Sequence, residues 1–207
     1  MRVGIITAWF ERGAANVSRS YMEGLQKLGH DVFIFARGGE EYSYAPDWNL
    51  PNVHYSKSVM GSSARCKYTG ISDLEEFEIW LETHRICVAL FNEQLDSVPP
   101  GLCRKKNIPP VLIAPGYVMP MEYYSHFDAI ACPTQLMYDI FQNTGIAHLV
   151  RWGVDANVFK PLGLNLTDEQ CVFFHSAGMS FGKSKILLSR RCVGTSAVAW
   201  RQDPHWL

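Results

Sequence analysis

The sequence has no excess of charge of either sign and no long hydrophobic run. Its 207 residues carry 19 Lys and Arg against 20 Asp and Glu, which gives a formal net charge of -1. No basic surface therefore argues for binding to nucleic acid or to an anionic membrane. The apolar run after Arg2 is too short for the core of a signal peptide or for a membrane span, so only a peripheral membrane contact stays open.

The usual signatures of metal and thiol chemistry are also missing. The six cysteines form no C-x-x-C pair, and the seven histidines show neither H-x-H nor H-E-x-x-H spacing. Cys87, Cys132 and Cys171 fall in apolar, strand-like runs, where a free thiol behaves as a small hydrophobic group. We therefore expect a reduced, cytoplasmic protein without a metal site.

Two nucleotide-binding fingerprints are absent as well. There is no G-x-G-x-x-G and no G-x-x-x-x-G-K-[ST] in the chain. These absences exclude the standard nicotinamide or flavin fingerprint and the P-loop. Ser18 and Ser20 lack the G-x-S-x-G surroundings of a hydrolase nucleophile elbow, so neither serine is indicated as a hydrolase nucleophile.

The clearest positive signal lies in the first forty residues. Residues 2–7 form a β-branched apolar run, residues 8–13 a glycine-bearing turn, residues 14–28 a helical stretch and residues 31–36 a second apolar run. This order predicts a right-handed βαβ crossover. Its loop brings main-chain N–H groups and the positive end of a helix dipole to the carboxyl edge of a parallel sheet, where anionic ligands dock.

Two glycines mark the ends of this helical stretch. Gly29 is placed to end the helix in a left-handed conformation. Gly13 either lets a ligand phosphate approach the backbone without meeting a Cβ, or merely eases a tight turn. The residues expected to form one apolar stripe against the sheet are Ala14, Val17, Tyr21, Leu25 and Leu28.

The rest of the first 150 residues alternates strands with helices. The expected strands are residues 53–55, 86–91, 110–114, 128–132 and 147–150. Asp73 is the expected N-cap of a helix to about residue 84, and Thr134 of one that Gly145 ends. This alternation predicts an α/β fold with a doubly wound parallel sheet. The helix that begins at Asp73 carries four glutamates, which are interpreted as a solvated face and not as paired catalytic carboxylates. They are Glu75, Glu76, Glu78 and Glu82.

The alternation of predicted strands and helices stops after residue 153. Residues 154–170 contain Asn, Pro, Gly and Asp and are predicted to be a connector. The 37 residues of 171–207 begin with a strand-like run but are too few for a stable core, since isolated segments below roughly 40 residues rarely make one. We therefore expect one complete domain, residues 1–153, followed by the incomplete start of a second.

Three segments carry a resemblance to a known family. In the first crossover the matching residues are Trp9, Phe10, Gly13, Leu25, Gly29, His30 and Val32. In residues 151–161 they are Gly153, Val154, Asp155, Phe159 and Pro161, and residues 128–134 give a weaker match. In this order the segments resemble the N-terminal half of GT-B glycosyltransferases of family 4, which are retaining sugar transferases.

The resemblance implies two Rossmann-like domains that face a cleft, the first for the acceptor and the second for a nucleoside diphosphate sugar. Such enzymes transfer a hexose with retention and stabilise the leaving diphosphate with helix N-termini and basic side chains, without a metal. The absence of an Asp-x-Asp motif suits that scheme. The residues that would face the donor phosphates or the acceptor are Glu11, Arg12, Gly13 and Ala14, with Lys183 and Lys185 near the family's basic pair. Gly153, Val154 and Asp155 would form the junction between the domains.

The departures from the family are concentrated near the end of the chain. Lys183 and Lys185 lack the spacing of the family's basic pair, and nothing after about Phe181 resembles the family. The later glutamate pair is missing, and Pro115, Gly116 and Tyr117 stand where some members carry a histidine. We therefore expect a shortened product with a frame-altered tail and little activity. The alternatives are a non-catalytic α/β binding fragment and a sugar-nucleotide epimerase-like protein.

Overall fold

The computed structural model describes residues 1–37, 46–57, 71, 73–114, 119–153, 156, 160, 187–192 and 195–200. The chain divides into two compact units, Met1–Gly153 and Val154–Leu207. In the second unit only the backbone of two strands and the isolated residues Ala156 and Lys160 are described.

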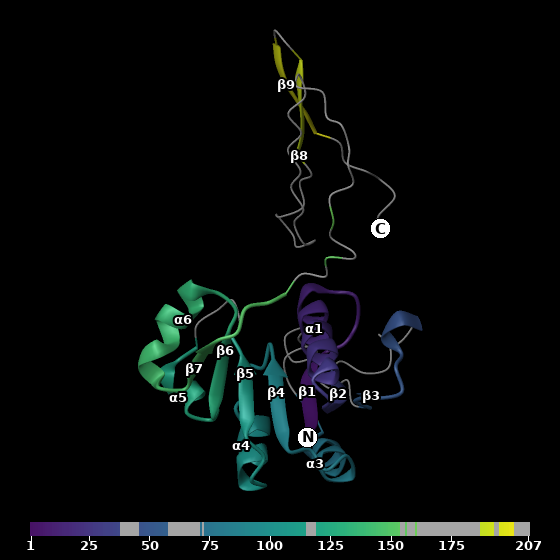
Figure 1. Cartoon of the computed structure of the whole chain (residues 1–207), viewed down its shortest axis with the longest axis vertical. Helices are drawn as coiled ribbons and strands as arrows, with labels where there is room; N and C mark the ends of the chain where they lie inside the picture. The colour runs from purple at the N-terminus through teal and green to yellow at the C-terminus, as the bar shows by residue number, and fades with distance from the viewer. Residues whose placement is uncertain are drawn as a thin grey trace. The chain divides into compact units, whose positions relative to one another are not determined.

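The first unit is built on a sheet of seven parallel strands (Figure 1). Their order across the sheet is β3-β2-β1-β4-β5-β6-β7. The strands are β1 (Arg2–Ala8), β2 (Asp31–Arg37), β3 (Val53–Tyr55), β4 (Val88–Asn92), β5 (Pro110–Ile113), β6 (Ala129–Cys132) and β7 (Ala147–Leu149). The register places Val3 of β1 between Val32 of β2 and Val88 of β4. The predicted doubly wound parallel sheet is therefore confirmed.

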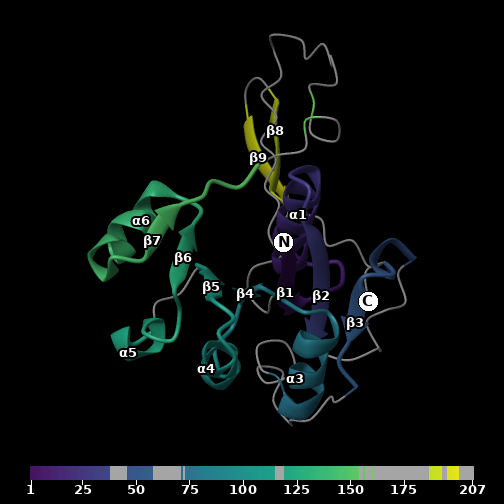
Figure 2. The ribbon, with the colours of Figure 1, turned by 60° about the horizontal axis from the view of Figure 1, so that its bottom comes forward.

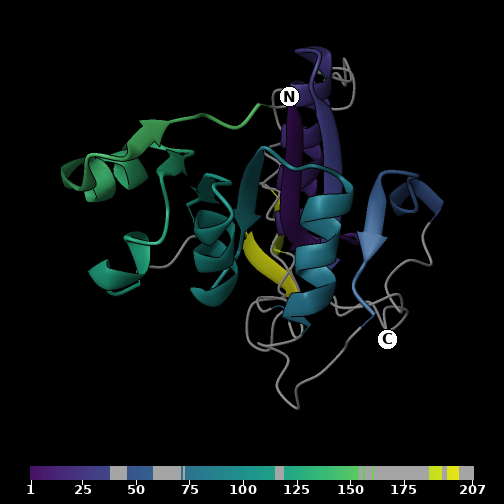
Figure 3. The ribbon, with the colours of Figure 1, turned by 90° about the horizontal axis from the view of Figure 1, so that it is seen from below.

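Helices cover both faces of this sheet, as Figures 2 and 3 show. The helical elements are α1 (Gly13–Lys27), η2 (Pro46–Trp48), α3 (Leu74–Thr83), α4 (Val98–Lys105), α5 (Met121–Tyr124), α6 (Gln135–Phe141) and η3 (Gln142–Thr144). Helix α1 and η2 pack with one apolar cluster, while α3, α4, α5 and α6 contribute to the other. Right-handed crossovers produce this division, because the chain leaves β1 toward β2 but leaves β4 toward β5.

The two clusters form the core of the unit. Ile5 and Ile34 lie on the side of α1, whereas Ile6, Phe35 and Phe91 lie on the side of α3, and all five side chains are inaccessible to solvent. Alternate residues of a strand point to opposite faces, so β1 supplies both clusters with apolar side chains. Complete burial of such a side chain contributes about 1.5–3 kcal/mol to stability.

Helix α1 packs on the sheet with most of the predicted stripe, since Val17, Tyr21 and Leu25 lie partly buried against the apolar cluster, but its most buried residues are others. Its buried residues are Ala15, Ser18 and Met22, while Leu28 at the end of the expected stripe is 74% exposed. Ser18, a polar residue, stands at the centre of the buried face because it makes buried hydrogen bonds at the sheet. A stripe drawn through the apolar residues alone misses such a position.

The predicted helix ends are confirmed at four positions. The carboxylate of Asp73 accepts from the N–H of Glu76, and the hydroxyl of Thr134 accepts from the N–H of Met137. Gly29 and Gly145 have φ values of 81° and 74°, so both take the left-handed conformation that stops a helix.

Two further helices end in the same way without glycine. Arg85 follows α3 with φ 50°, and Asn107 follows α4 with φ 58°. In each case the next N–H donates back to the last turn, Ile86 to Leu81 and Ile108 to Cys103. These are the hydrogen bonds of a Schellman motif. The left-handed position of the motif, usually a glycine, is here occupied by Arg85 and Asn107.

Gly4 in β1 marks a close approach between helix and sheet. A Cβ on this residue would lie 2.8 Å from Cη2 of Trp80, so only glycine leaves room for the indole ring. Trp80 of α3 is 3% exposed and packs edge-on against Phe35. Helix α3 is thus seated directly on the backbone of a central strand.

The start of β4 corrects one expectation. The predicted strand began at residue 86, but β4 begins at Val88, and Cys87 before it is exposed. The thiol of Cys87 is therefore not a core group, whereas Cys132 in β6 is buried as expected.

The described part of the second unit is an antiparallel pair, β8 (Leu187–Cys192) and β9 (Thr195–Trp200). The sequence did not predict this hairpin. The strand expected at residues 171–175 lies outside the described residues, and the start of a second domain stays a prediction. Within the described part of the chain, no helix is long and apolar enough to cross a membrane.

Candidate functional site

The order of the strands defines one special place at the carboxyl edge of the sheet. Strand β1 leads to β2 on one side and lies next to β4, which leads to β5 on the other side (Figure 1). Ligands of open α/β sheets bind at such a switch point. Two connections meet there: residues 9–12, called the first loop, and residues 93–97, called the second loop.

The first loop leads into a helix N-terminus without a side-chain cap. Arg12 occupies the N-cap position, but its side chain makes no capping hydrogen bond, and no acid stands in the first turn of α1. The N–H of Asn16 donates to the carbonyl of Arg12 at 3.0 Å and is the first to find an acceptor in the helix. The preceding N–H groups of α1 lack intrahelical acceptors and favour an anion at this end.

Gly13 begins the helix and is exposed. A Cβ built on Gly13 meets no atom within 4 Å, and its φ is outside the left-handed range. Neither packing against the described residues nor the backbone therefore requires glycine at this position. A side chain on the first residue of α1 would therefore meet no described atom nearby.

An ion pair joins the two loops. Nη2 of Arg12 lies 2.9 Å from Oε2 of Glu93, and both side chains are about 30% exposed. The Arg12 guanidinium also lies over the ring of Phe10, 5.6 Å from its centroid. Glu93 has a φ of 52°, which is unusual for a residue with a Cβ and occurs often at functional sites.

A buried arginine holds the second loop in place. Arg37 at the end of β2 is 2% exposed and donates to the carbonyls of Asn92 and Glu93 and to Oε1 of Gln94. The hydroxyl of Tyr123 donates to the carbonyl of Gln94. The backbone on both sides of Glu93 is thus fixed by side chains from β2 and α5.

Asn92 ties the second loop to α1. Its Nδ2 donates to the carbonyl of Ala14 at 2.8 Å and to Oγ of Ser18 at 2.9 Å. Ser18 in turn donates to Oγ1 of Thr7 in β1 at 2.9 Å. These groups are almost fully buried, so their hydrogen bonds define the relative position of β1, β4 and α1.

The charged side chains at the switch point are of both signs. Arg12 and Arg37 are the cationic groups, and Glu11, Glu93 and Asp96 of the two loops are the acidic ones. Arg37 is covered by the second loop, so Arg12 is the cation within reach of solvent. Together with the first N–H groups of α1, Arg12 can stabilise charge on a phosphate oxygen.

Comparison with known proteins yields matches at the level of structure alone. No protein-family model matches the sequence, and no curated protein matches it. The UDP-GlcNAc 2-epimerase from Methanocaldococcus jannaschii aligns with 70% of this chain and 43% of its own, at 19% identity and a TM-score of 0.52. MurG from Acinetobacter baumannii aligns with 64% and 41%, at 14% identity and a TM-score of 0.45.

The first unit matches part of a GT-B fold. Each alignment spans less than half of the solved protein, and identity below 20% shows the fold alone. The Rossmann-like, GT-B-type architecture predicted from the sequence is confirmed, while membership of family 4 stays a prediction.

Four predicted ligand-facing residues lie together at the switch point. Glu11 is exposed in the first loop, Arg12 reaches across to Glu93, Gly13 leaves open space, and the carbonyl of Ala14 is held by Asn92.

Of the other predicted site residues, the structure describes Gly153 alone. Gly153 is exposed at the end of the first unit. Val154, Asp155, Lys183 and Lys185 lie outside the described residues.

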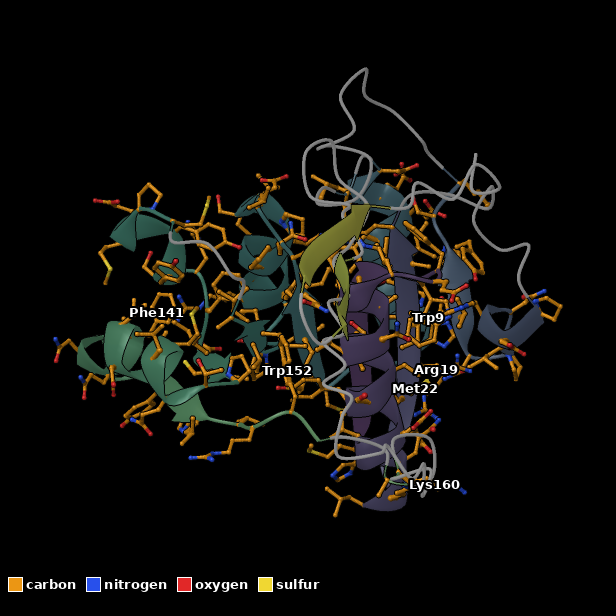
Figure 4. The ribbon with its side chains drawn as sticks, turned by 90° about the horizontal axis from the view of Figure 1, so that it is seen from above. Trp9, Arg19, Met22, Phe141, Trp152 and Lys160 are labelled. Atoms are coloured by element: carbon orange, nitrogen blue, oxygen red, sulfur yellow. The ribbon has the colours of Figure 1, made fainter. Side chains whose placement is uncertain are left out.

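Trp9, Tyr123 and Tyr124, three large aromatic residues near the switch point, are packing residues and are not available to stack on a sugar. Trp9 is inaccessible, donates from Nε1 to the carbonyl of Trp48 at 2.8 Å and meets that ring edge-on (Figure 4 labels Trp9). Tyr123 and Tyr124 are 7% and 1% exposed. Of the first-loop aromatics, Phe10 is the one that keeps a partly exposed face, beside Arg12.

Sequence reasoning missed the second loop. The sequence analysis did not consider Asn92, Glu93 and Gln94, although these three polar residues stand at the end of an apolar strand run. A polar residue at the end of a buried strand faces the carboxyl edge of the sheet, where sites of this fold class lie. The position of these polar residues at the end of the strand could have identified the second loop from the sequence.

A hollow lies away from the switch point, between β3 and α3. It has a volume of about 380 Å³, and its lining includes His54, Lys57, Glu76, Trp80 and His84. Desolvation lowers the pKa of His84, and the positive charges of His54 and Arg2 lower it further.

Glu76 at this hollow corrects the prediction of a uniformly solvated helix face. Its side chain is 10% exposed and accepts from Nε2 of His54 at 2.8 Å, from Oγ of Ser56 at 3.1 Å and from the N–H of Lys57 at 3.0 Å. Glu76 therefore fastens the edge strand β3 to α3. Among the described residues no group of three or more His, Cys, Asp or Glu side chains is placed to hold a metal ion.

Proposed function

We propose that Met1–Gly153 is the acceptor-side half of a retaining, nucleotide-sugar-dependent glycosyltransferase that transfers a hexose. The observation that carries the proposal is the uncapped N-terminus of α1, open above Gly13 and flanked by Arg12, at the switch point of a GT-B-type sheet. The resemblance of the first crossover to family 4 supports it.

The chemistry of such a transfer suits these groups. When the bond between sugar and diphosphate breaks, negative charge grows on the departing phosphate oxygen. Main-chain N–H groups at a helix N-terminus and the guanidinium of Arg12 stabilise that charge without a metal ion. Gly13 lets the phosphate come close to these donors, because no Cβ stands in front of them.

A sugar-nucleotide epimerase is the second candidate, because one solved protein with this fold is a UDP-GlcNAc 2-epimerase. The two activities differ in a measurable way. A glycosyltransferase releases nucleoside diphosphate in proportion to glycosylated acceptor, whereas an epimerase changes a stereocentre of the sugar without an acceptor. Product analysis by NMR after incubation with a nucleotide sugar distinguishes them.

Binding of UDP, GDP and ADP to the whole chain, measured by calorimetry, tests the proposed site. At least one of them should bind, and Gly13→Ala should weaken that binding about tenfold, because the new methyl group enters the space of the phosphate. The matched control is Gly24→Ala, which lies in the same helix and also meets no atom within 4 Å.

Both variants should fold, and neither should lose stability, since alanine is a better helix former than glycine by about 1 kcal/mol. If no nucleoside diphosphate binds, the proposal is wrong and the chain is a binding fragment for another partner. If Gly13→Ala and Gly24→Ala bind equally well, the ligand does not approach the N-terminus of α1.

A further inference from the structure

We propose that Glu93 is a built-in competitor of the ligand: its carboxylate occupies the place on Arg12 that a diphosphate takes when it binds. This inference rests on the proposed function, since it concerns the same switch point. In this role, Glu93 determines how much negative charge a ligand must carry to bind at Arg12.

The ion pair is placed where a ligand can replace it. Oε2 of Glu93 lies 2.9 Å from Nη2 of Arg12, and the side chains are 29% and 30% exposed, so a ligand reaches the guanidinium from solvent. The pair bridges the first and second loops directly beside the N-terminus of α1. A diphosphate that uses the α1 N–H groups therefore meets the Glu93 carboxylate and must displace it from Arg12.

The backbone of Glu93 is fixed while its side chain is not enclosed. Arg37 binds the carbonyls of Asn92 and Glu93, and Tyr123 binds that of Gln94. These contacts hold Glu93 at a φ of 52°, a conformation that glycine or asparagine adopts more readily. Because the main chain is anchored, a ligand can move the carboxylate by side-chain rotation without disturbing the loop.

The competition has a consequence for specificity. A partly exposed ion pair is weak, so a ligand with several negative charges replaces one carboxylate easily. A ligand with a single charged group gains little by the exchange. Glu93 therefore discriminates in favour of a diphosphate over a monoanionic ligand. Removal of its negative charge should raise the affinity for both ligands and reduce the ratio between the two affinities.

The experiment uses the whole chain with inorganic pyrophosphate and inorganic phosphate as probes, in calorimetric titrations at low ionic strength. Glu93→Gln keeps the shape of the side chain and removes its charge. We expect it to bind pyrophosphate about fivefold more tightly than the unaltered chain. Arg12→Gln should weaken binding about tenfold, and the double variant should show no gain from Glu93→Gln, because the competition needs Arg12.

The matched control is Asp128→Asn, which removes one negative charge at the opposite edge of the sheet. Asp128 precedes β6 and pairs with Arg104 at 2.8 Å, with both side chains nearly half exposed. This variant should bind pyrophosphate as the unaltered chain does. An equal gain from Asp128→Asn and Glu93→Gln would overturn the proposal, because net charge alone would then explain the effect.

The outcomes separate this inference from the proposed function. If Arg12→Gln weakens binding but Glu93→Gln leaves it unchanged or weakens it, Glu93 is no competitor and the anion site stands. If neither the unaltered chain nor Glu93→Gln binds pyrophosphate or any nucleoside diphosphate, both proposals fail. Should Glu93→Gln not fold, as judged by circular dichroism, Glu93→Asp withdraws the carboxylate from Arg12 by one methylene and must itself tighten binding.

Discussion

The two loops at the switch point are neighbours in space but opposite in construction. The first loop ends at a helix N-terminus without a side-chain cap, and Gly13 behind it has open space above its Cα. The second loop is anchored by Arg37 and Tyr123, and Glu93 within it takes a positive φ. The helix after the first loop begins with N–H groups that have no intrahelical acceptor, whereas the second loop has its backbone acceptors occupied.

Under the proposed function, this difference lets a parallel sheet keep a binding edge without losing stability. Unsatisfied donors are tolerated in the first loop because they are open to solvent. The buried polar groups of the second loop are paired, as burial demands. Substitutions of the buried groups that anchor the second loop should therefore affect folding, whereas those in the first loop and of the partly exposed Glu93 side chain should affect binding.

The largest effect is expected from Arg37→Met. This change removes the donor for two backbone carbonyls and Oε1 of Gln94 while it keeps most of the side-chain volume. Buried acceptors that lose their partner should lower the free energy of unfolding by about 3 kcal/mol, measured by urea denaturation. Arg104→Met, at an exposed ion pair, is the control and should change it by less than about 1 kcal/mol. Equal effects of the two changes would refute the contrast between the loops.

A smaller effect is expected from Ser18→Ala on the buried face of α1. Ser18 accepts from Asn92 and donates to Thr7, so its loss should lower the free energy of unfolding by about 1–2 kcal/mol. Ser20→Ala is the matched control two residues along the same helix, where the exposed hydroxyl only bonds the carbonyl of Asn16. The control should leave chemical denaturation unchanged or slightly raise stability, because alanine favours helices.

The ion pair between the loops should contribute still less to stability. A double-mutant cycle of Arg12→Gln and Glu93→Gln should give a coupling free energy of about 0.5–1 kcal/mol, since both side chains are partly exposed. The cycle is measured by thermal or urea denaturation without ligand. A coupling free energy well above this range would mean that the ion pair stabilises the fold. The first loop would then contribute to stability as the second loop does, which contradicts the contrast between them.

The smallest effect concerns pH and arises outside both loops, since neither contains a histidine. The pKa of His84 is lowered in the folded protein, mainly by desolvation. The unfolded chain therefore binds the proton more readily, and stability should fall as pH drops below about 6.5, the ordinary pKa of histidine. His84→Gln should flatten this dependence between pH 7 and 5, as followed by urea denaturation at each pH. A flat profile in the unaltered chain would exclude this contribution.

Much of the frame of the first unit was predictable from local sequence. The βαβ crossover, the N-caps Asp73 and Thr134 and the left-handed glycines 29 and 145 are all found as predicted. Each depends on a few consecutive residues, whose capping or turn preferences act within one helical turn.

The second loop could not be predicted in the same way. The partner of Glu93 is Arg12, 81 residues earlier, and the anchor of the loop is Arg37, more than 50 residues earlier. Both contacts exist only because β1 lies between β2 and β4 in the folded sheet. Local patterns of hydrophobicity do not contain that order, and they also favour apolar residues over a buried serine such as Ser18.

The close approach of Gly4 to the indole of Trp80 limits how this chain can change. A side chain at position 4 would strike the ring at 2.8 Å, and a smaller residue at position 80 would leave an empty space over the strand. Either substitution alone should be selected against, whereas a matched pair could be accepted. Among descendants of such a chain, positions 4 and 80 should therefore vary together or not at all.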